Sequence, residues 1–108
     1  MVYTIDTIRD CITPIAKKYR LNAVYLFGSY ARGTATEASD IDLLIDTAGT
    51  DIKSLLDLAT VYCELEEALG KQIDLITVSS LKQPIQRPSE AAFRANVLKE
   101  RVSLYAAA

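Results

Sequence analysis

Three aspartates stand at or near the start of apolar segments with the composition of β-strands. Asp40 and Asp42 are the first and third residues of DIDLLID, and Asp74 is the third residue of QIDLIT. Because residues i and i+2 of a strand point to the same side, Asp40 and Asp42 should face one way, about 6–7 Å apart. If the strand that carries Asp74 pairs with this strand, all three carboxylates can face one cleft.

Three carboxylates on a partly dry surface need a cation, because each would otherwise repel the others and have a raised pKa. The nearest basic residues in the chain are Arg32, before the pair, and Lys71, three residues before Asp74. A hard divalent cation fits better, and Mg²⁺ is typically held by one or two carboxylates plus substrate phosphates. The alternative, that these acids are solvated strand ends, is weakest for Asp74, which lies between Ile73 and Leu75.

The chain has no histidine, which excludes Ser-His triads and His-ligated zinc. Gly28 and Ser29 directly follow the apolar run 23–27, and the stretch SYAR can begin a short helix. Free backbone N–H groups and a serine hydroxyl can bind an anion there, Gly28 permits close approach, and Arg32 adds charge. A Gly-Ser pair after a strand is by itself most often a turn. Beside a carboxylate pair, it indicates phosphoryl or nucleotidyl transfer.

Size and composition limit the other possibilities. A chain of 108 residues that is 50% hydrophobic predicts one domain over 1–108. A formal charge of −2 gives no basic surplus, so direct nucleic-acid binding is not expected. No apolar run reaches the about 18 residues of a membrane span, and MVYTIDTIRD does not resemble a signal peptide, so we expect a cytoplasmic protein. Cys11 and Cys63 lack metal or redox spacing and are expected to be buried or half-buried.

The apolar pattern predicts elements in the order α-β-β-α-β-α, a small sheet with helices packed on it in the α/β or α+β class. The first helix should contain a kink or broken turn at Pro14. The long helix should be capped by Thr50 or Asp51. Most of its apolar stripe should consist of Ile52, Leu55, Leu56, Ala59, Cys63 and Leu69. The expected ranges are helix 4–19, strand 23–27, strand 41–45, helix 51–69, strand 72–78, loop 79–89 and helix 90–105.

The combined motif resembles the signature of the nucleotidyltransferases of the DNA polymerase β superfamily, which is Gly-Ser, a ten-residue spacer and Asp-x-Asp; here the spacer is 30–39. VYLFGSYARG and SDIDLLID are similar to the minimal nucleotidyltransferases, or MNT proteins. KQIDLIT supplies the third carboxylate, and VLKERVSLY resembles the last helix of that group. The resemblance covers nearly the whole chain and implies the small mixed sheet of the polymerase β palm.

The resemblance also implies an activity. Asp40 and Asp42 would bind Mg²⁺, and Asp74 would complete the metal site or act as the base. The nucleoside triphosphate would be held by Gly28, Ser29, Arg32 and Ser39. The reaction would transfer a nucleoside monophosphate, AMP from ATP, to a hydroxyl. MNT proteins are commonly paired with a HEPN-domain toxin, so the implied acceptor is a tyrosine of that toxin and the implied assembly is a hetero-oligomer.

Two other function classes stay open. An antitoxin could neutralise its partner by occlusion alone, since a chain of 108 residues leaves little room for an acceptor pocket. A nucleotidyltransferase of the aminoglycoside type would share the motif, but those enzymes carry an additional acceptor domain. This chain would therefore need oligomerisation to supply that pocket. Three converging acids favour catalysis over binding alone.

Overall fold

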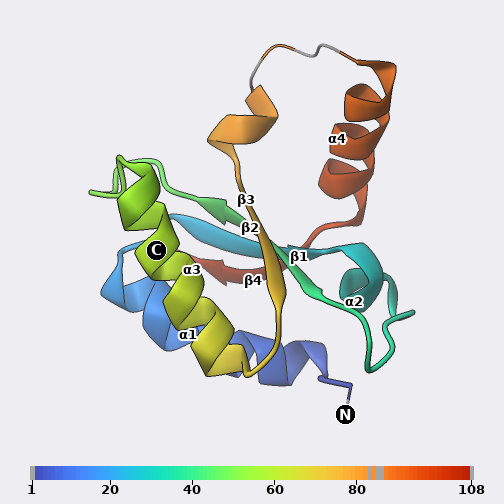
Figure 1. Cartoon of the computed structure of the whole chain (residues 1–108), viewed down its shortest axis with the longest axis horizontal. Coiled ribbons are helices and arrows are strands. Elements are labelled where there is room, and N and C mark those ends of the chain that lie inside the picture. The colour runs from blue at the N-terminus through green and yellow to red at the C-terminus, as the bar shows by residue number, and fades with distance from the viewer. Residues whose placement is uncertain (1, 83, 85–86, 108) are drawn as a thin grey trace.

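The computed structural model describes residues 2–82, 84 and 87–107 (Figure 1). Gln83, Ile85 and Gln86, in the segment that we expected to be a loop, lie outside the described residues. Within the described ranges, no helix is long and apolar enough to cross a membrane. The elements are α1 (Ile5–Lys18), β1 (Ala23–Phe27), α2 (Gly28–Arg32), β2 (Ile41–Asp46), α3 (Leu55–Leu69), β3 (Ile73–Thr77), the 3-10 helix η1 (Ser79–Lys82), α4 (Pro88–Glu100) and β4 (Val102–Ala106).

The strands form a mixed sheet in the order β3-β2-β1-β4. β1 is antiparallel to β2 and β4, whereas β2 and β3 are parallel. Parallel neighbours require a crossover connection, which α3 provides. The register places Asp42 opposite Asp74 on β3 and opposite Phe27 on β1. The predicted fold class, a small mixed sheet with helices packed on it, is confirmed.

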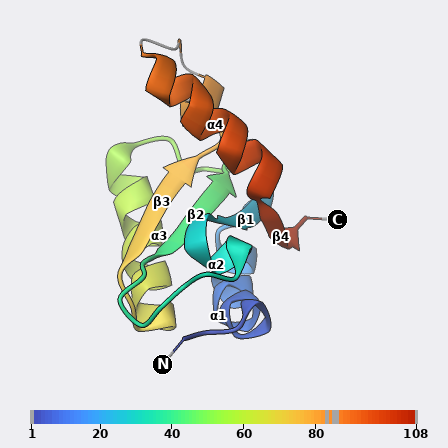
Figure 2. The ribbon, with the colours of Figure 1, turned by 90° about the vertical axis from the view of Figure 1, so that its right-hand side faces the viewer.

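The two faces of the sheet are covered differently. On one face, α1 and α3 bury alternate strand residues such as Leu26, Leu43 and Ile45 in the main core. On the other face, Phe27 and Leu44 pack against α4 in a smaller cluster. Figures 1 and 2 show α1 and α3 side by side, with α4 at the opposite end of the molecule. Because side chains alternate along β2, Asp42 shares the face of Leu44, which α4 only partly covers.

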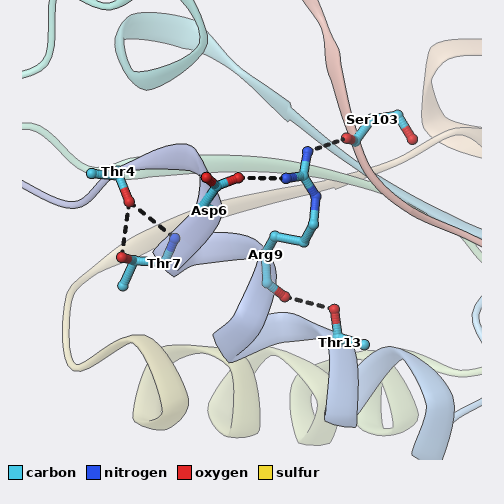
Figure 3. Close-up of polar contacts among 6 residues, drawn as sticks. All are labelled: Thr4, Asp6, Thr7, Arg9, Thr13 and Ser103. Atoms are coloured by element: carbon cyan, nitrogen blue, oxygen red, sulfur yellow. Dashed lines mark hydrogen bonds and ion pairs between the residues drawn. The ribbon is translucent and has the colours of Figure 1, made fainter.

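α1 is continuous through its proline. Thr4 caps the helix, and its Oγ1 accepts the Thr7 N–H at 3.1 Å (Figure 3). The broken turn that we predicted at Pro14 is wrong, because apolar residues before and after it are buried in the same core. The Thr13 hydroxyl donates to the Arg9 carbonyl at 2.6 Å. The Arg9 guanidinium donates to the Ser103 carbonyl at 3.2 Å, which ties α1 to β4.

The last helix is shorter than predicted and a strand follows it. α4 ends at Glu100, and the segment Val102–Ala106, which we expected to continue the helix, pairs antiparallel with β1 as β4. Leu104 is buried in the main core and the β-branched Val102 packs against that core, an alternation that suits a strand. The partner edge belongs to β1, far away in the sequence, so the local pattern could not reveal the pairing.

α3 begins later than predicted and buries another face. It starts at Leu55 and is capped by Ser54, whose Oγ accepts the Asp57 N–H at 3.1 Å, so the caps expected at Thr50 or Asp51 are wrong. The buried residues are Val61, Leu65 and Leu69, so the expected stripe is confirmed at Leu69. Its members Leu55, Leu56, Ala59 and Cys63 are exposed, and Ile52 precedes the helix. Both sides of this helix are apolar, and packing on α1 and β3 selects one. Cys11 is half-buried as expected, but Cys63 is exposed.

Leu65→Ala should lower the free energy of unfolding by about 2–5 kcal/mol, because Leu65 is fully buried and its truncation leaves a cavity. The matched control is Leu56→Ala on the same helix, where 79% exposure predicts a change within about 0.5 kcal/mol. Urea denaturation followed by circular dichroism measures both. Equal losses would contradict the assigned buried face of α3.

Candidate active site

A cleft of about 420 Å³ opens between the acidic part of the sheet and α4. Part of its lining comes from four elements, α2, β2, β3 and α4, and consists of Gly28 and four charged residues, Arg32, Asp42, Asp74 and Glu100. The remaining lining is apolar except for Asn96. The cleft therefore has a charged part and an apolar part, and both are built from residues distant in the sequence.

Asp42 and Asp74 meet in this cleft because their strands are parallel and in register. This is the juxtaposition that the two apolar segments predicted. Burial raises the pKa of Asp42 to about 6, together with a hydrogen bond to Asp74 and the negative charges of Asp74 and Asp40, while the charge of Arg32 opposes the shift. Asp74 is exposed on the edge strand, although its apolar neighbours suggested a buried position. The two carboxylates are thus held together at an electrostatic cost.

Gly28 makes this arrangement sterically feasible. Its φ of +74° lies in the left-handed region, and a side chain there would be strained. A Cβ added to Gly28 would overlap Oδ2 of Asp42 and lie 2.9 Å from its Cγ. A glycine is therefore required at this position mainly because the Asp42 carboxylate lies so close to the backbone. The short helix expected after it is confirmed as α2, which is only five residues long.

The other predicted site residues lie at different distances from the cleft. Arg32 lines it, but its guanidinium pairs with Glu100 at 3.1 Å. Asp40 is outside the lining, yet near enough for its charge to raise the pKa of Asp42. Ser29 lies in the first turn of α2, also outside the lining. Ser39 is used locally, since its Oγ accepts the Thr36 N–H at 2.9 Å.

The carboxylate oxygens in the cleft are suited to bind a hard cation, but they do not form a complete metal site by themselves. Within the described residues, no three or more Asp, Glu or Cys side chains are gathered closely enough to hold a metal ion. The three-acid metal site therefore stays a prediction. The pair formed by Asp42 and Asp74 supplies oxygen ligands only, and the raised pKa of Asp42 is a state that a divalent cation would relieve. Mg²⁺ needs only one or two carboxylates when substrate phosphates complete its shell, and this pair fits that requirement.

Sequence reasoning missed the wall of the cleft that α4 contributes. Phe93, Asn96, Val97 and Glu100 follow the spacing of one helix face, and all four line the cleft. That spacing is visible in the sequence, but nothing there indicates that this face of α4 turns toward Asp42. Tyr30, which follows Ser29, is 4% exposed and belongs to the main core, outside the cleft lining.

Comparison with known proteins identifies the family. The sequence profile of the family described as polymerase beta, nucleotidyltransferase, matches residues 10–107. A Methanocaldococcus jannaschii relative that carries a protein adenylyltransferase name is 44% identical over 77 residues, which are 71% of this chain and 81% of the relative. The protein adenylyltransferase MntA of Thermococcus cleftensis is 38% identical over 88 residues, covering 78% of this chain and 87% of MntA.

Solved structures share the fold. A toxin–antitoxin crystal structure with AMP-PNP superposes with a TM-score of 0.68 at 24% identity, covering 92% of this chain and 73% of the other. A complex of a tri-AMPylated Shewanella oneidensis HEPN toxin with its MNT antitoxin gives a TM-score of 0.65 at 20% identity, covering 96% and 74%. Because the family profile spans nearly the whole chain, the chain belongs to the polymerase β nucleotidyltransferase family and is a homologue of the MntA protein adenylyltransferases.

Proposed function

We propose that residues 1–108 act as a single minimal nucleotidyltransferase domain that transfers AMP from ATP to a tyrosine hydroxyl of a HEPN-domain toxin, and so serve as its antitoxin. The observation that carries this proposal is the in-register pair of Asp42 and Asp74 in a cleft that also contains Gly28 and Arg32. The relatives named as protein adenylyltransferases support the AMP transfer. The structure with an AMPylated HEPN toxin supports the acceptor class, and the AMP-PNP complex supports ATP as donor.

Each residue of the site has a separate role in the proposed reaction. Asp40 and Asp42 would hold Mg²⁺, and Asp74, opposite Asp42 on β3, would act as the base. When bound, the metal neutralises triphosphate charge and makes the α-phosphorus more electrophilic. Gly28 and Ser29, at the start of α2, and Ser39, in the loop before β2, would hold the triphosphate. Arg32 exchanges its pairing with Glu100 for a charge-assisted contact with a phosphate oxygen.

The chemical step is an in-line displacement. The tyrosine oxygen attacks the α-phosphorus and forms a new P–O bond, while the bond between the α-phosphorus and the bridging oxygen to the β-phosphate breaks. The electron pair of that bond leaves with pyrophosphate. The hydroxyl proton passes to the carboxylate of Asp74, which is exposed at the sheet edge and accessible to an acceptor from another molecule.

Asp42→Asn should reduce AMP transfer by about 100-fold or more, because it removes a charge that acts at the reacting phosphate. The assay incubates the chain with labelled ATP, Mg²⁺ and a co-purified HEPN partner, and counts label on the partner. Asp46→Asn, on the same strand but outside the cleft lining, is the matched control and should keep its activity. Neutralisation of the toxin by the Asp40→Asn/Asp42→Asn double variant at equal expression would favour occlusion instead.

Gly28→Ala should abolish transfer, because the added methyl group displaces the Asp42 carboxylate. Gly33→Ala is the matched control: its φ of +78° imposes similar backbone strain, but a Cβ there meets nothing within 4 Å. Both variants should lose about 1 kcal/mol or more of stability from strain. Only Gly28→Ala should lose activity beyond its loss of folded protein, measured by label transfer normalised to the folded fraction. Equal activity of the two variants would contradict the role of this contact.

The ionisation of Asp42 and the ionisation of Asp46 should affect stability in opposite directions. The folded state keeps the Asp42 proton up to about pH 6, whereas the unfolded chain loses it near pH 3.8, so ionisation of Asp42 lowers stability as pH rises through this window. In the absence of metal, the Tm of Asp42→Asn should therefore rise relative to the Tm of the parent between about pH 4 and about pH 7.

Asp46 is the control for this measurement, because its pKa is shifted in the opposite direction. Hydrogen bonds from the Asn22 amide and the Ala48 N–H lower the pKa of Asp46, so its charge stabilises the fold above its unfolded pKa, and this contribution is lost as pH falls. Asp46→Asn should thus lose Tm at neutral pH and recover toward the parent in acid. Scanning fluorimetry in the presence of EDTA measures both variants, and parallel pH profiles would contradict the two assignments.

A further inference from the structure

The apolar part of the cleft adjoins the acidic pair and has no role in the proposed chemistry. Its lining consists of Phe27, Leu75, Ile76, Phe93 and Val97, to which Asn96 adds one amide. Phe93 and Val97 come from α4, while Leu75 and Ile76 come from β3. In Figure 1, α4 stands opposite the end of β3 that leads into η1. The side chains of Ile76 on β3 and of Phe93 and Val97 on α4 thus form the two walls of one slot, whereas the Leu75 side chain packs against the main core.

Phe93 is oriented by the core while remaining accessible. Its ring packs edge-on against Phe27, with centroids 6.2 Å apart and an interplanar angle of 83°. Phe27 is 6% exposed, so it is a fixed support, whereas Phe93 is 47% exposed and lines the cleft. A supported aromatic ring with a free surface in a cleft is suited to stack on a planar ring, since base–aromatic stacking tolerates any base.

Asn96 adds a polar group beside that ring. It lies three residues after Phe93, on the same face of α4, and lines the same cleft. Among the described residues, no hydrogen bond engages its side-chain amide. An amide presents one acceptor and one donor direction side by side, the pattern that complements the amino group and the neighbouring ring nitrogen of adenine.

The order of groups along α4 matches the order of groups in a nucleoside triphosphate. Glu100 stands at the charged end, paired with Arg32, and Phe93 stands seven residues earlier at the apolar end. A rise of 1.5 Å per residue puts these two positions about 10 Å apart along the helix axis. That length leaves room for a ribose between phosphates at Arg32 and a base at Phe93.

We propose that Phe93 and Asn96 form the nucleobase subsite of this cleft, with Phe93 stacking on the base and Asn96 hydrogen-bonding to its edge. The proposal rests on the proposed nucleotidyl transfer and adds to it the residues that bind the base. The face of α4 that lines the cleft then extends along the length of the bound nucleotide. Its charged end lies near the phosphates, and its aromatic end holds the base.

The test measures binding rather than transfer, so that the subsite and the reaction are examined separately. Isothermal titration calorimetry with the full chain and Mg²⁺ uses three probes: ATP, GTP and inorganic tripolyphosphate. Phe93→Ala should weaken ATP and GTP binding by roughly five- to a hundredfold and leave tripolyphosphate binding unchanged. Leu98→Ala, an exposed apolar position on the same helix outside the cleft lining, is the matched control and should leave all three affinities unchanged.

Asn96→Asp should shift the preference from ATP toward GTP by about tenfold or more, because a carboxylate accepts hydrogen bonds from the guanine N–H groups but cannot donate to adenine. Tripolyphosphate affinity corrects for the added charge. Unchanged ATP affinity in Phe93→Ala, or equal losses for all three probes, would overturn the subsite. Failure of the parent chain to bind any of the probes would overturn the proposed function together with it.

Discussion

The approach of the Asp42 carboxylate to the backbone at Gly28, beside Asp74, is the contact on which the rest of the structure depends. It requires a glycine at the end of β1, because any Cβ there would overlap the carboxylate. It also requires β3 to lie parallel to β2 in a register that pairs Asp42 with Asp74. That register requires the crossover through α3, whose buried face fixes it against α1 and the sheet.

This contact is unfavourable by itself, and the opposite face of the sheet compensates for it. Burial and neighbouring negative charges raise the pKa of Asp42, so ionising it in the absence of a cation lowers stability. The main core, formed by α1, α3 and the strand residues between them, holds the largest fully buried side chains, such as Ile8, Leu43 and Leu65. Stability and chemistry are thus placed on opposite faces of one sheet, a separation that strand alternation permits.

α4 is attached to this assembly through one buried residue and several surface contacts. Val97 is its only buried residue in the described part of the chain. The edge-on contact of Phe93 with Phe27, the pairing of Glu100 with Arg32 and a hydrogen bond from the Arg94 guanidinium to the Ser80 carbonyl add to its attachment. The Glu100 pair is partly exposed and contributes little to stability, but it occupies the one arginine that lines the cleft. The wall formed by α4 therefore joins the charged and apolar parts of the cleft.

The sequence alone determined the strands of the site and the acids they carry. Asp42 and Asp74 sit in short apolar runs with strand composition, and Gly28 ends another, so local pattern sufficed to predict these strands. The meeting of the two acids was predicted only on the condition that their strands pair, and the parallel register fulfils that condition. Tertiary structure decided which apolar side of α3 is buried, because Leu55 and Leu65 are chemically equivalent until α1 and the sheet select one. It also decided that 102–106 is a strand, since the partner edge belongs to β1. The placement of Phe93, Asn96 and Glu100 in the cleft depends on the same long-range packing of α4, and no local period in a sequence encodes where a helix face points.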